Sequence, residues 1–395
     1  MDIQLAQRID AVKPSLTLAV TAKARELKAA GRDVIGLGAG EPDFDTPDHI
    51  KAAAIQAIHD GFTKYTAVDG MPGLKQSICD KFRRDNKLEY SPNQILVSCG
   101  GKQSFYNLAQ ALLNPGDEVI IPAPYWVSYP DMVRLAMGTP VIVGAGIQQN
   151  FKITAEQLEK AITPKTKLFV INSPSNPTGA VYNREELQAL ADVLLAHPHV
   201  IIASDDMYEH IRWSRDPFVN LVNLAPALYE RTLVLNGVSK AYSMTGWRIG
   251  YAAGPEKVIK AMKTIQSQST SNPTSISQVA AQAALDGDQN FIRRMRTEFE
   301  ERHQFIITAL NDIDGVQCLP SEGAFYAFPH MQGVIDRLEG IEDDLQLAAY
   351  LLDKCGIALV PGTAFGAPGY LRLSFAIDLK TLKEAARRLA EGLSG

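Results

Sequence analysis

The sequence contains few cysteines, and none of them stands in a paired arrangement. Four occur among 395 residues, far apart and without a CxxC spacing: Cys79, Cys99, Cys318 and Cys355. This pattern excludes a disulfide framework and a cysteine zinc site, so we expect no metal, and it predicts reduced thiols in the protein core.

The sequence also lacks a long apolar run, a cationic leader and an excess of positive charge. No stretch of about 18 apolar residues occurs, and the start, MDIQLAQRIDAVKPS, has no cationic segment followed by an apolar one. The formal net charge is −5. Neither nucleic acid nor an anionic membrane surface is therefore indicated as a partner, and we expect a cytoplasmic protein.

Chain length and apolar pattern indicate an α/β protein with two domains. A chain of 395 residues exceeds the length of about 250–300 residues that a single core usually serves. From residue 94 onward, short apolar runs alternate with stretches of helical spacing: ILVSCG, EVIIP, PVIVGA, KLFVINSP, VIIASDD, TLVLN and RIGYAAG. Such alternation predicts a mostly parallel sheet covered by helices on both faces.

We expect a large domain over residues 45–287 and a smaller α+β domain formed by residues 1–44 and 288–395. In the last part of the chain the helices become longer and the strands fewer, among them AFYAFP, IALVP and YLRLSFA. The helical spacing of residues 16–30 suits packing against this second part. The small domain would close over a site at the junction, where substrates often bind.

The stretch NGVSKAYSMTGWRIGY, residues 236–251, carries the main candidate for chemistry. It follows the apolar run TLVL, presents Lys240, and reaches Arg248 eight residues later. A lysine at the mouth of an α/β sheet can form a Schiff base with an aldehyde cofactor, and a nearby arginine can neutralise the phosphate of that cofactor. A single lysine is more often a solvated loop residue, so this interpretation depends on the neighbouring strand ends.

Two other strand ends carry turns that suit a ligand. In SCGGKQS, Gly100 and Gly101 lead straight into a helix whose free amides can bind a phosphate, and a simple tight turn is the alternative. In NSPSNPTG, two prolines and a glycine fix the backbone around Asn176. Its side chain is therefore either a ligand contact or part of an ordinary turn.

Charged residues in apolar surroundings form a further signal. In VIIASDDMYEH, a carboxylate at the end of a buried strand, Asp205 or Asp206, needs a cation or a strong donor unless it caps a helix, and Tyr208 could share its side of the site. In YLRLSF, Arg372 suits bidentate capture of a carboxylate, with an internal salt bridge as the alternative. Because parallel strands end at one edge of a sheet, we expect these groups to share one site.

Five motifs occur in a family order along nearly the whole chain: GAGEPDF, NSPSNPTG, DDMYEH, SKAYSMTGWRIGY and YLRLSF. Together they resemble the fold-type-I, pyridoxal-phosphate-dependent aminotransferases, and within them the class I branch that includes bacterial aspartate aminotransferases. The resemblance implies pyridoxal 5'-phosphate as cofactor. It also implies a ping-pong reaction, in which an amino acid leaves its nitrogen on the cofactor and a 2-oxo acid collects it.

The resemblance assigns roles around the cofactor ring. Lys240 binds the cofactor covalently and then moves the substrate proton, while Asp205 pairs with the pyridine nitrogen and keeps it protonated. Tyr208 and Asn176 hydrogen-bond the phenolic oxygen of the ring. Trp126, in APYWVSYP, stacks on the ring and borders the substrate.

The resemblance also assigns the phosphate and the substrate carboxylate. The phosphate lies on the turn at Gly100, the amides of Gly101 and Lys102, and Arg248. Tyr65, in TKYTAVDG, reaches this phosphate from the partner subunit, which makes a homodimer part of the site. The α-carboxylate of the substrate is held by Arg372, the Gly40 backbone and Asn176.

Substrate choice is expected to rest on Lys102 and Thr17. The animal-type aspartate enzymes bring a second arginine from the partner subunit in a region that here, over residues 264–282, contains neither arginine nor lysine. In the bacterial subgroup a lysine serves acidic substrates, and Lys102 with Thr17 after KPSL match that pattern. We therefore expect aspartate or glutamate as amino donor and 2-oxoglutarate or oxaloacetate as acceptor. Some members of this subgroup also aminate prephenate.

Three alternatives share the same cofactor fold, because a fold does not fix a reaction. The first is an aminotransferase for aromatic or branched amino acids, or one of broad specificity. The second is a carbon–sulfur lyase, which needs no acceptor acid. The third is a cofactor-bound regulator, against which the complete set of site residues argues.

Overall fold

The computed structural model describes residues 3–214 and 216–393, with a seven-stranded sheet at its centre. Its strands are β2 (Ile95–Ser98), β3 (Glu118–Ala123), β4 (Thr139–Gly144), β5 (Thr166–Asn172), β6 (Ile201–Asp205), β7 (Thr232–Gly237) and β8 (Gly250–Ala253). They lie in the order β2-β8-β7-β6-β5-β3-β4, and β8 alone runs in the direction opposite to the other six. The predicted, mostly parallel sheet is confirmed.

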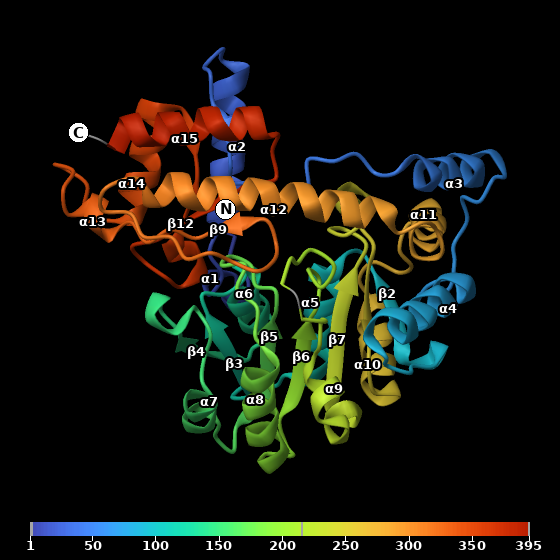
Figure 1. The fold of residues 1–395 in the computed structure, drawn as a ribbon. Helices are drawn as coiled ribbons and strands as arrows, with labels where there is room; N and C mark the ends of the chain where they lie inside the picture. Colours follow the sequence, from blue (N-terminus) through green and yellow to red (C-terminus); the bar gives the residue numbers. More distant parts are fainter. Residues whose placement is uncertain (1–2, 215, 394–395) are drawn as a thin grey trace.

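Helices follow most strands and cover the sheet. In chain order they are α1 (Gln7–Asp10), α2 (Leu16–Ala29), α3 (Asp48–His59), α4 (Pro72–Lys81), α5 (Gly101–Leu112), α6 (Ser128–Leu135), α7 (Ala155–Ala161), α8 (Arg184–Ala196), α9 (Leu221–Leu224), α10 (Glu256–Ser267), α11 (Ser275–Asp286), α12 (Asn290–Asn311), α13 (Gln332–Ile335), α14 (Asp344–Tyr350) and α15 (Leu379–Leu393). Figure 1 shows the sheet and its helices below α12, which crosses the molecule above the strand ends.

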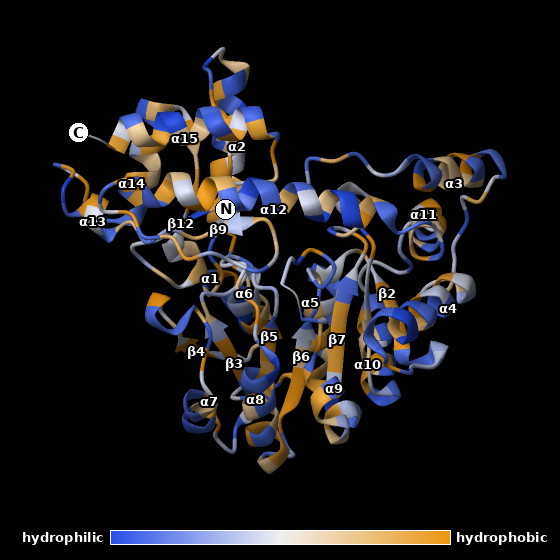
Figure 2. Cartoon of the chain, in the orientation of Figure 1, coloured by the Kyte–Doolittle hydropathy of each residue, from blue (hydrophilic) through white to orange (hydrophobic). Residues whose placement is uncertain are grey.

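Both faces of the sheet are buried, and β5 shows why. Successive side chains of a strand point to opposite faces. Leu168 and Val170 accordingly pack with α5, α6 and α10, whereas Phe169 and Ile171 pack with α7, α8 and α9. Figure 2 shows the result, apolar strands inside and helices of mixed polarity around them. A continuous apolar run is therefore the pattern that this position requires.

A second layer lies over the carboxyl ends of β5, β6 and β7. It contains α2, α12, α14 and α15, the parallel pair β1 (Ile35–Gly36) and β10 (Ile357–Ala358), and the antiparallel strands β9 (Tyr326–Ala327), β11 (Val360–Pro361) and β12 (Leu371–Ser374). Its core also includes Tyr208 and Ile211 from the chain between residues 45 and 287. The predicted division into two domains at residues 45 and 287 therefore stays a prediction.

The four cysteines are free thiols, but only two of them lie in the core. Cys79 and Cys318 are buried, whereas Cys99 and Cys355 are half-buried. The expectation that all four are core thiols is wrong for these two, because Cys99 lies in the turn after β2 and Cys355 lies at the end of a helical turn just before β10.

Within the described ranges, no helix combines the length and the apolar character that crossing a membrane requires.

Candidate active site

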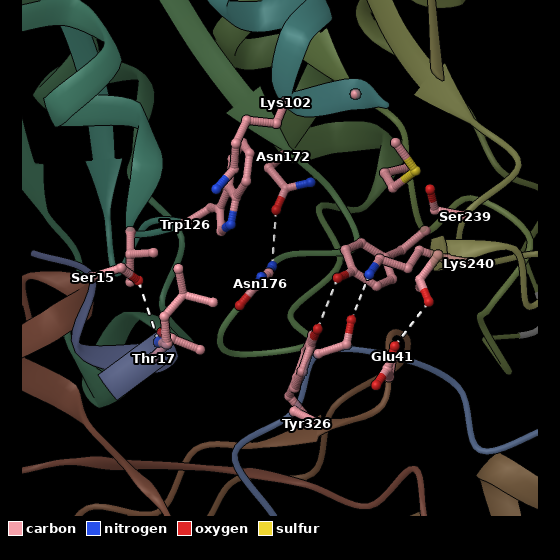
Figure 3. Close-up of a pocket in the computed structure, with 18 of the residues that line it drawn as sticks. Ser15, Thr17, Glu41, Lys102, Trp126, Asn172, Asn176, Ser239, Lys240 and Tyr326 are labelled. Carbon is pink, nitrogen blue, oxygen red and sulfur yellow. Dashed lines mark hydrogen bonds between the residues drawn. The ribbon is translucent and has the colours of Figure 1, made fainter. Parts of the chain in front are cut away.

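A cavity of about 360 Å³ opens between the carboxyl ends of the central strands and the second layer. It brings together eleven of the residues predicted for the site: Thr17, Gly40, Gly101, Lys102, Trp126, Asn176, Asp205, Tyr208, Lys240, Arg248 and Arg372. Gly100 does not line the cavity, but it directly precedes Gly101, which does. Tyr65 lies outside it, with 91% of its surface exposed. Figure 3 shows Lys240 and Trp126 entering the cavity from different sides.

Lys240 follows β7 and points across the cavity to the backbone of the N-terminal segment. Its Nζ donates to the carbonyl oxygen of Gly40 at 2.5 Å. Burial lowers the pKa of Lys240 to about 8, with further lowering by Arg372 and Arg248 and an opposing effect of Glu41. A lysine with this pKa is partly neutral at physiological pH and can attack an aldehyde carbon.

Asp205, and not Asp206, faces the cavity. Asp206 is fully buried beneath it, where it accepts hydrogen bonds from Ser204 and Asn220. Asp205 ends β6 and accepts from the backbone amide of Met207 at 3.2 Å. Burial raises the pKa of Asp205, so a cation placed beside it in the cavity would stabilise its charged form.

Tyr129 is a site residue that the sequence analysis missed. Its hydroxyl donates to Oδ2 of Asp205 at 2.5 Å, and its ring meets that of Trp126 edge-on at 5.1 Å. It is 2% exposed and lies in α6. The spacing of three residues in WVSY was the available signal, since the turn that leads into α6 brings the amide of Tyr129 to the carbonyl of Trp126 at 3.0 Å. The hydrogen bond from Tyr129 thus fixes the orientation of the Asp205 carboxylate.

Arg372 is 2% exposed, and none of the described acidic side chains pairs with it. Its Nη1 donates to Oδ1 of Asn176 at 2.9 Å and its Nη2 to the carbonyl of Gly38 at 2.6 Å. Its Nε is buried without a partner. The alternative of an internal salt bridge is therefore wrong for the described residues, and the guanidinium keeps its capacity for an incoming carboxylate.

The turn before α5 is built for close approach. Gly100 has φ +88° and α5 begins at Gly101. A Cβ at Gly100 would lie 2.3 Å from Nη2 of Arg248, so only glycine allows the arginine this close. Arg248 is itself exposed, and its Nη1 donates to the carbonyl of Thr245 at 2.7 Å. The first amides of a helix have no intrahelical partner, so this corner presents free donors and a cation.

Two residues predicted for substrate recognition line the outer part of the cavity. Lys102 is exposed, and its Nζ lies 5.2 Å from the centre of the Trp126 ring. Thr17, in the first turn of α2, has a buried hydroxyl that no described residue contacts by a hydrogen bond. Both polar groups are therefore available to a ligand.

Glu41 and Tyr326 also line the cavity and were not predicted. Glu41 lies in GAGEPDF and accepts a hydrogen bond from the hydroxyl of Thr245 at 2.8 Å. Tyr326 lies in β9, and its hydroxyl is 2.9 Å from that of Tyr208. Sequence alone does not distinguish this tyrosine from an ordinary strand residue, because its role depends on pairing with a distant strand.

The residues present fit an aldehyde cofactor that carries a phosphate and a basic ring nitrogen. Lys240 supplies an amine of lowered pKa, Asp205 a partly desolvated carboxylate, and the α5 corner with Arg248 an anion site. The orphaned Nε of Arg372 leaves a further donor for a carboxylate in the same cavity. This set matches pyridoxal 5'-phosphate together with an amino or 2-oxo acid.

Comparison with known proteins gives a consistent result. Residues 32–389 match the family model described as aminotransferase class I and II. The aspartate/prephenate aminotransferase of Nitrosomonas europaea is 60% identical over 397 residues, covering 99% of this chain and 100% of the relative. That of Cereibacter sphaeroides is 58% identical over 395 residues, covering 99% of each.

Solved structures agree over the same length. An aspartate aminotransferase from Rhizobium meliloti has a TM-score of 0.96 at 49% identity, covering 100% of this chain and 99% of the other. The aspartate aminotransferase from Thermus thermophilus with maleate has a TM-score of 0.93 at 43% identity, covering 99% and 100%.

Proposed function

Since the chain belongs to the class I and II aminotransferases, we propose that it moves the amino group of aspartate or glutamate to a 2-oxo acid by a ping-pong mechanism. The acceptors would be 2-oxoglutarate, oxaloacetate and prephenate. The observation that carries this proposal is that Lys240, Asp205 and Arg372 face one cavity. They provide a base, a partner for a ring nitrogen and a binding group for a carboxylate. Relatives named aspartate/prephenate aminotransferase support the choice of substrates.

We propose pyridoxal 5'-phosphate as the cofactor. Lys240 would bind it covalently, Asp205 would hold a proton on its ring nitrogen, and Trp126 would cover one face of its ring. Its phenolic oxygen would be bound by Tyr208 and Asn176, and its phosphate by the Gly100 turn, the amides of Gly101 and Lys102, and Arg248. When bound, the cofactor would withdraw electrons from the substrate Cα and so make the Cα proton acidic.

The protein's own groups then bind the substrate and move its proton. Arg372 would bind the α-carboxylate beside Asn176 and the Gly40 backbone, which fixes the direction of the Cα–H bond. The Nζ of Lys240 would be the base for the Cα proton, since its lowered pKa keeps it partly unprotonated. Closure of the second layer over the cavity would exclude water.

Preference for acidic substrates would come from Lys102 and Thr17. With Lys240, Arg248 and Arg372 engaged elsewhere, Lys102 and Arg25 are the cations of the cavity wall left for a second carboxylate, and Lys102 is the one next to the Trp126 ring. Residues 264–282 supply no basic side chain. An exposed amine that meets a carboxylate inside the cavity forms a charge-assisted hydrogen bond.

A substrate panel with Lys102→Met tests this proposal. The wild type should prefer aspartate and glutamate over phenylalanine and alanine, with 2-oxoglutarate, oxaloacetate and prephenate as acceptors. Loss of a charged hydrogen bond of about 1.5–3 kcal/mol should lower kcat/KM for aspartate by about 10- to 100-fold and leave phenylalanine unchanged. Lys165→Met, at an exposed lysine, is the control. Equal losses on both amino acids, or pyruvate release without an acceptor, would contradict the proposal.

We propose that the enzyme acts as a homodimer in which Tyr65 reaches the phosphate site of the partner. Tyr65 is almost fully exposed, and beside it in the chain α3 exposes an apolar stripe. Ile55 and Ile58 in α3 and Phe62 just after it are 55%, 52% and 38% exposed, and neighbouring exposed apolar side chains are typical of a surface that another chain covers.

The large domain would comprise residues 45–287 and the small domain residues 1–44 and 288–395. Residues 1–2 and 394–395, which belong to the proposed small domain, lie outside the described ranges. We also propose a cytoplasmic location, which suits the four free thiols.

A further inference from the structure

We propose that Tyr326 is a positioning residue that orients the hydroxyl of Tyr208 toward the bound cofactor. This inference rests on the proposed function. It concerns a residue of the second layer that contacts two groups of the site at once, the guanidinium of Arg372 and the hydroxyl of Tyr208.

The placement of Tyr326 follows from strand pairing. In the antiparallel pair of β9 and β12, Tyr326 lies opposite Ser374. Arg372 is two residues along β12 from Ser374, so its side chain emerges on the same face of the sheet as that of Tyr326. The guanidinium carbon of Arg372 accordingly lies 4.5 Å from the centre of the Tyr326 ring. The ring thus supports the arginine on one side.

The hydroxyl of Tyr326 sits in a tight space. It lies 2.9 Å from the hydroxyl of Tyr208, and a Cβ at Gly40 would approach it to 2.8 Å. Tyr326 is 1% exposed and Tyr208 is 4% exposed. Burial raises the pKa of both phenols, so both keep their protons at neutral pH. Each hydroxyl then has one proton to donate.

The number of protons fixes the direction of the chain of hydrogen bonds. If Tyr208 donates its proton to the phenolic oxygen of the cofactor, it must accept one from Tyr326. The guanidinium of Arg372 opposes the effect of burial on the pKa of both phenols, and it lies directly against the ring of Tyr326, which favours Tyr326 as the donor of the two. An accepted hydrogen bond in turn polarises the hydroxyl of Tyr208 and strengthens its donation.

The experiment compares Tyr326→Phe, Tyr208→Phe and the double variant, each loaded with pyridoxal 5'-phosphate. The pH midpoint of the cofactor absorption band is measured, because a weaker donor at the phenolic oxygen raises this midpoint. Tyr326→Phe keeps the ring against Arg372, so we expect an upward shift of about half a pH unit and an unchanged KM for aspartate. Tyr208→Phe should shift the midpoint further, and the double variant should equal Tyr208→Phe alone.

Tyr350→Phe is the matched control, since it removes a hydroxyl that donates to the carbonyl of Gly392 outside the cavity. It should leave the midpoint at the wild-type value. An unchanged midpoint in Tyr326→Phe, or a shift that persists in the Tyr208→Phe background, would overturn the inference. Failure of the wild type to develop a cofactor absorption band would instead overturn the proposed function.

Discussion

At the residue scale, Lys240 shows how surroundings set reactivity. Its amine has left bulk water, and none of the described carboxylates forms an ion pair with it. Burial therefore decides the direction of its pKa shift, and the two arginines of the cavity act in the same direction. Burial and Arg248 lower the pKa of Lys102 in the same direction, whereas Lys81 is buried but paired with Glu209.

The pH dependence of cofactor capture tests this reading of Lys240. Only the neutral amine attacks an aldehyde, so the capture rate by cofactor-free protein should rise by about tenfold per pH unit and level off near pH 8. Stopped-flow absorbance after mixing with pyridoxal 5'-phosphate gives this rate. N-acetyl-lysine amide is the reference. A protein curve that still rises toward about pH 10, as for an ordinary lysine, would contradict the assignment.

The choice between Asp205 and Asp206 marks a limit of the sequence. Both follow the same buried run, and neither composition nor spacing separates them. The structure separates them by strand alternation, which turns Asp206 under the sheet edge toward Ser204 and Asn220. The resemblance to a family chose Asp205, whereas the residue pattern alone left both open.

At the element scale, strands were easier to predict than their directions. All seven apolar runs became strands of one sheet, because burial on both faces demands continuous apolar residues. The antiparallel direction of β8 had no such signal, since an apolar run looks the same read either way. Tyr326 and Tyr129 were missed for a related reason, as their contacts depend on elements far apart in the chain.

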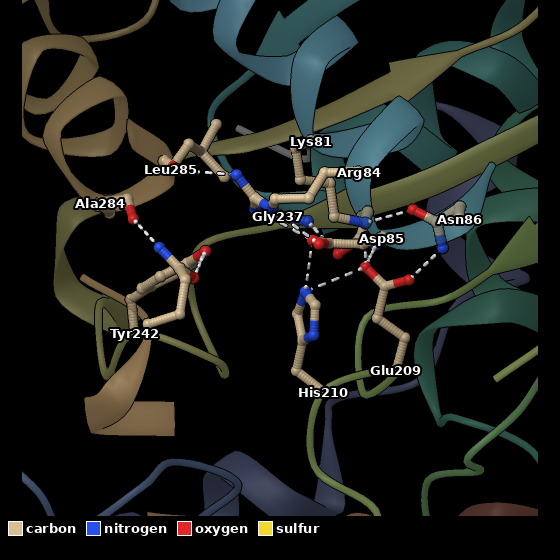
Figure 4. A network of polar contacts seen from close by, with 12 residues as sticks. Lys81, Arg84, Asp85, Asn86, Glu209, His210, Gly237, Tyr242, Ala284 and Leu285 are labelled. Carbon is tan, nitrogen blue, oxygen red and sulfur yellow. Dashed lines mark hydrogen bonds and ion pairs between the residues drawn. The ribbon is translucent and has the colours of Figure 1, made fainter. Parts of the chain in front are cut away.

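A buried polar network supports the loop that carries Tyr208 (Figure 4). Lys81, at the end of α4, forms an ion pair with Glu209, and their side chains are 1% and 3% exposed. Asn86 and Asn236 donate to the same carboxylate at 2.5 Å and 2.7 Å. Burial alone would raise the pKa of Glu209, but Lys81 and His210 bring it below its usual value. The charged carboxylate of Glu209 thus holds the loop that carries Tyr208, and this charge depends on Lys81.

Lys81→Met should destabilise the enzyme strongly. It leaves Glu209 buried without a cation, which costs about 3–5 kcal/mol. Urea unfolding gives the change, and a second substitution, Glu209→Gln, should recover part of the loss. The matched control is Lys160→Met, in an exposed pair with Glu156, which should leave the urea midpoint close to the wild-type value because an exposed ion pair adds little stability. Equal costs for Lys81→Met and Lys160→Met would show that the buried pair does not hold this loop.

At the scale of the whole molecule, the cavity depends on parts from distant regions of the chain. The sheet supplies Asp205 and Lys240, the N-terminal segment Gly40, and the C-terminal part Arg372. The motif order in the sequence predicted this assembly, but the orientation of the second layer and the contacts of Tyr326 required the structure. Of the predicted residues, Gly100 directly precedes the lining residue Gly101, and Tyr65 lies away from the cavity altogether.

Mixing two inactive variants tests whether Tyr65 serves the partner's site. Chains with Lys240→Ala and chains with Tyr65→Ala should each have low activity. In a mixed dimer, the Tyr65→Ala chain keeps Lys240 and receives an intact Tyr65 from its partner. After equal mixing and exchange of subunits, about a quarter of all sites should regain wild-type function. No recovery, despite proven exchange, would place Tyr65 in its own chain's site or outside any site.

Covalent attachment of the cofactor to Lys240 is tested most directly by borohydride reduction followed by peptide mass spectrometry. Reduction fixes the cofactor to the lysine that holds it, so its mass should appear on the peptide containing Lys240. Lys102, the other lysine that lines the cavity, should remain unmodified. Cofactor mass on Lys102 with Lys240 free, or no covalent attachment in the loaded enzyme, would contradict the account.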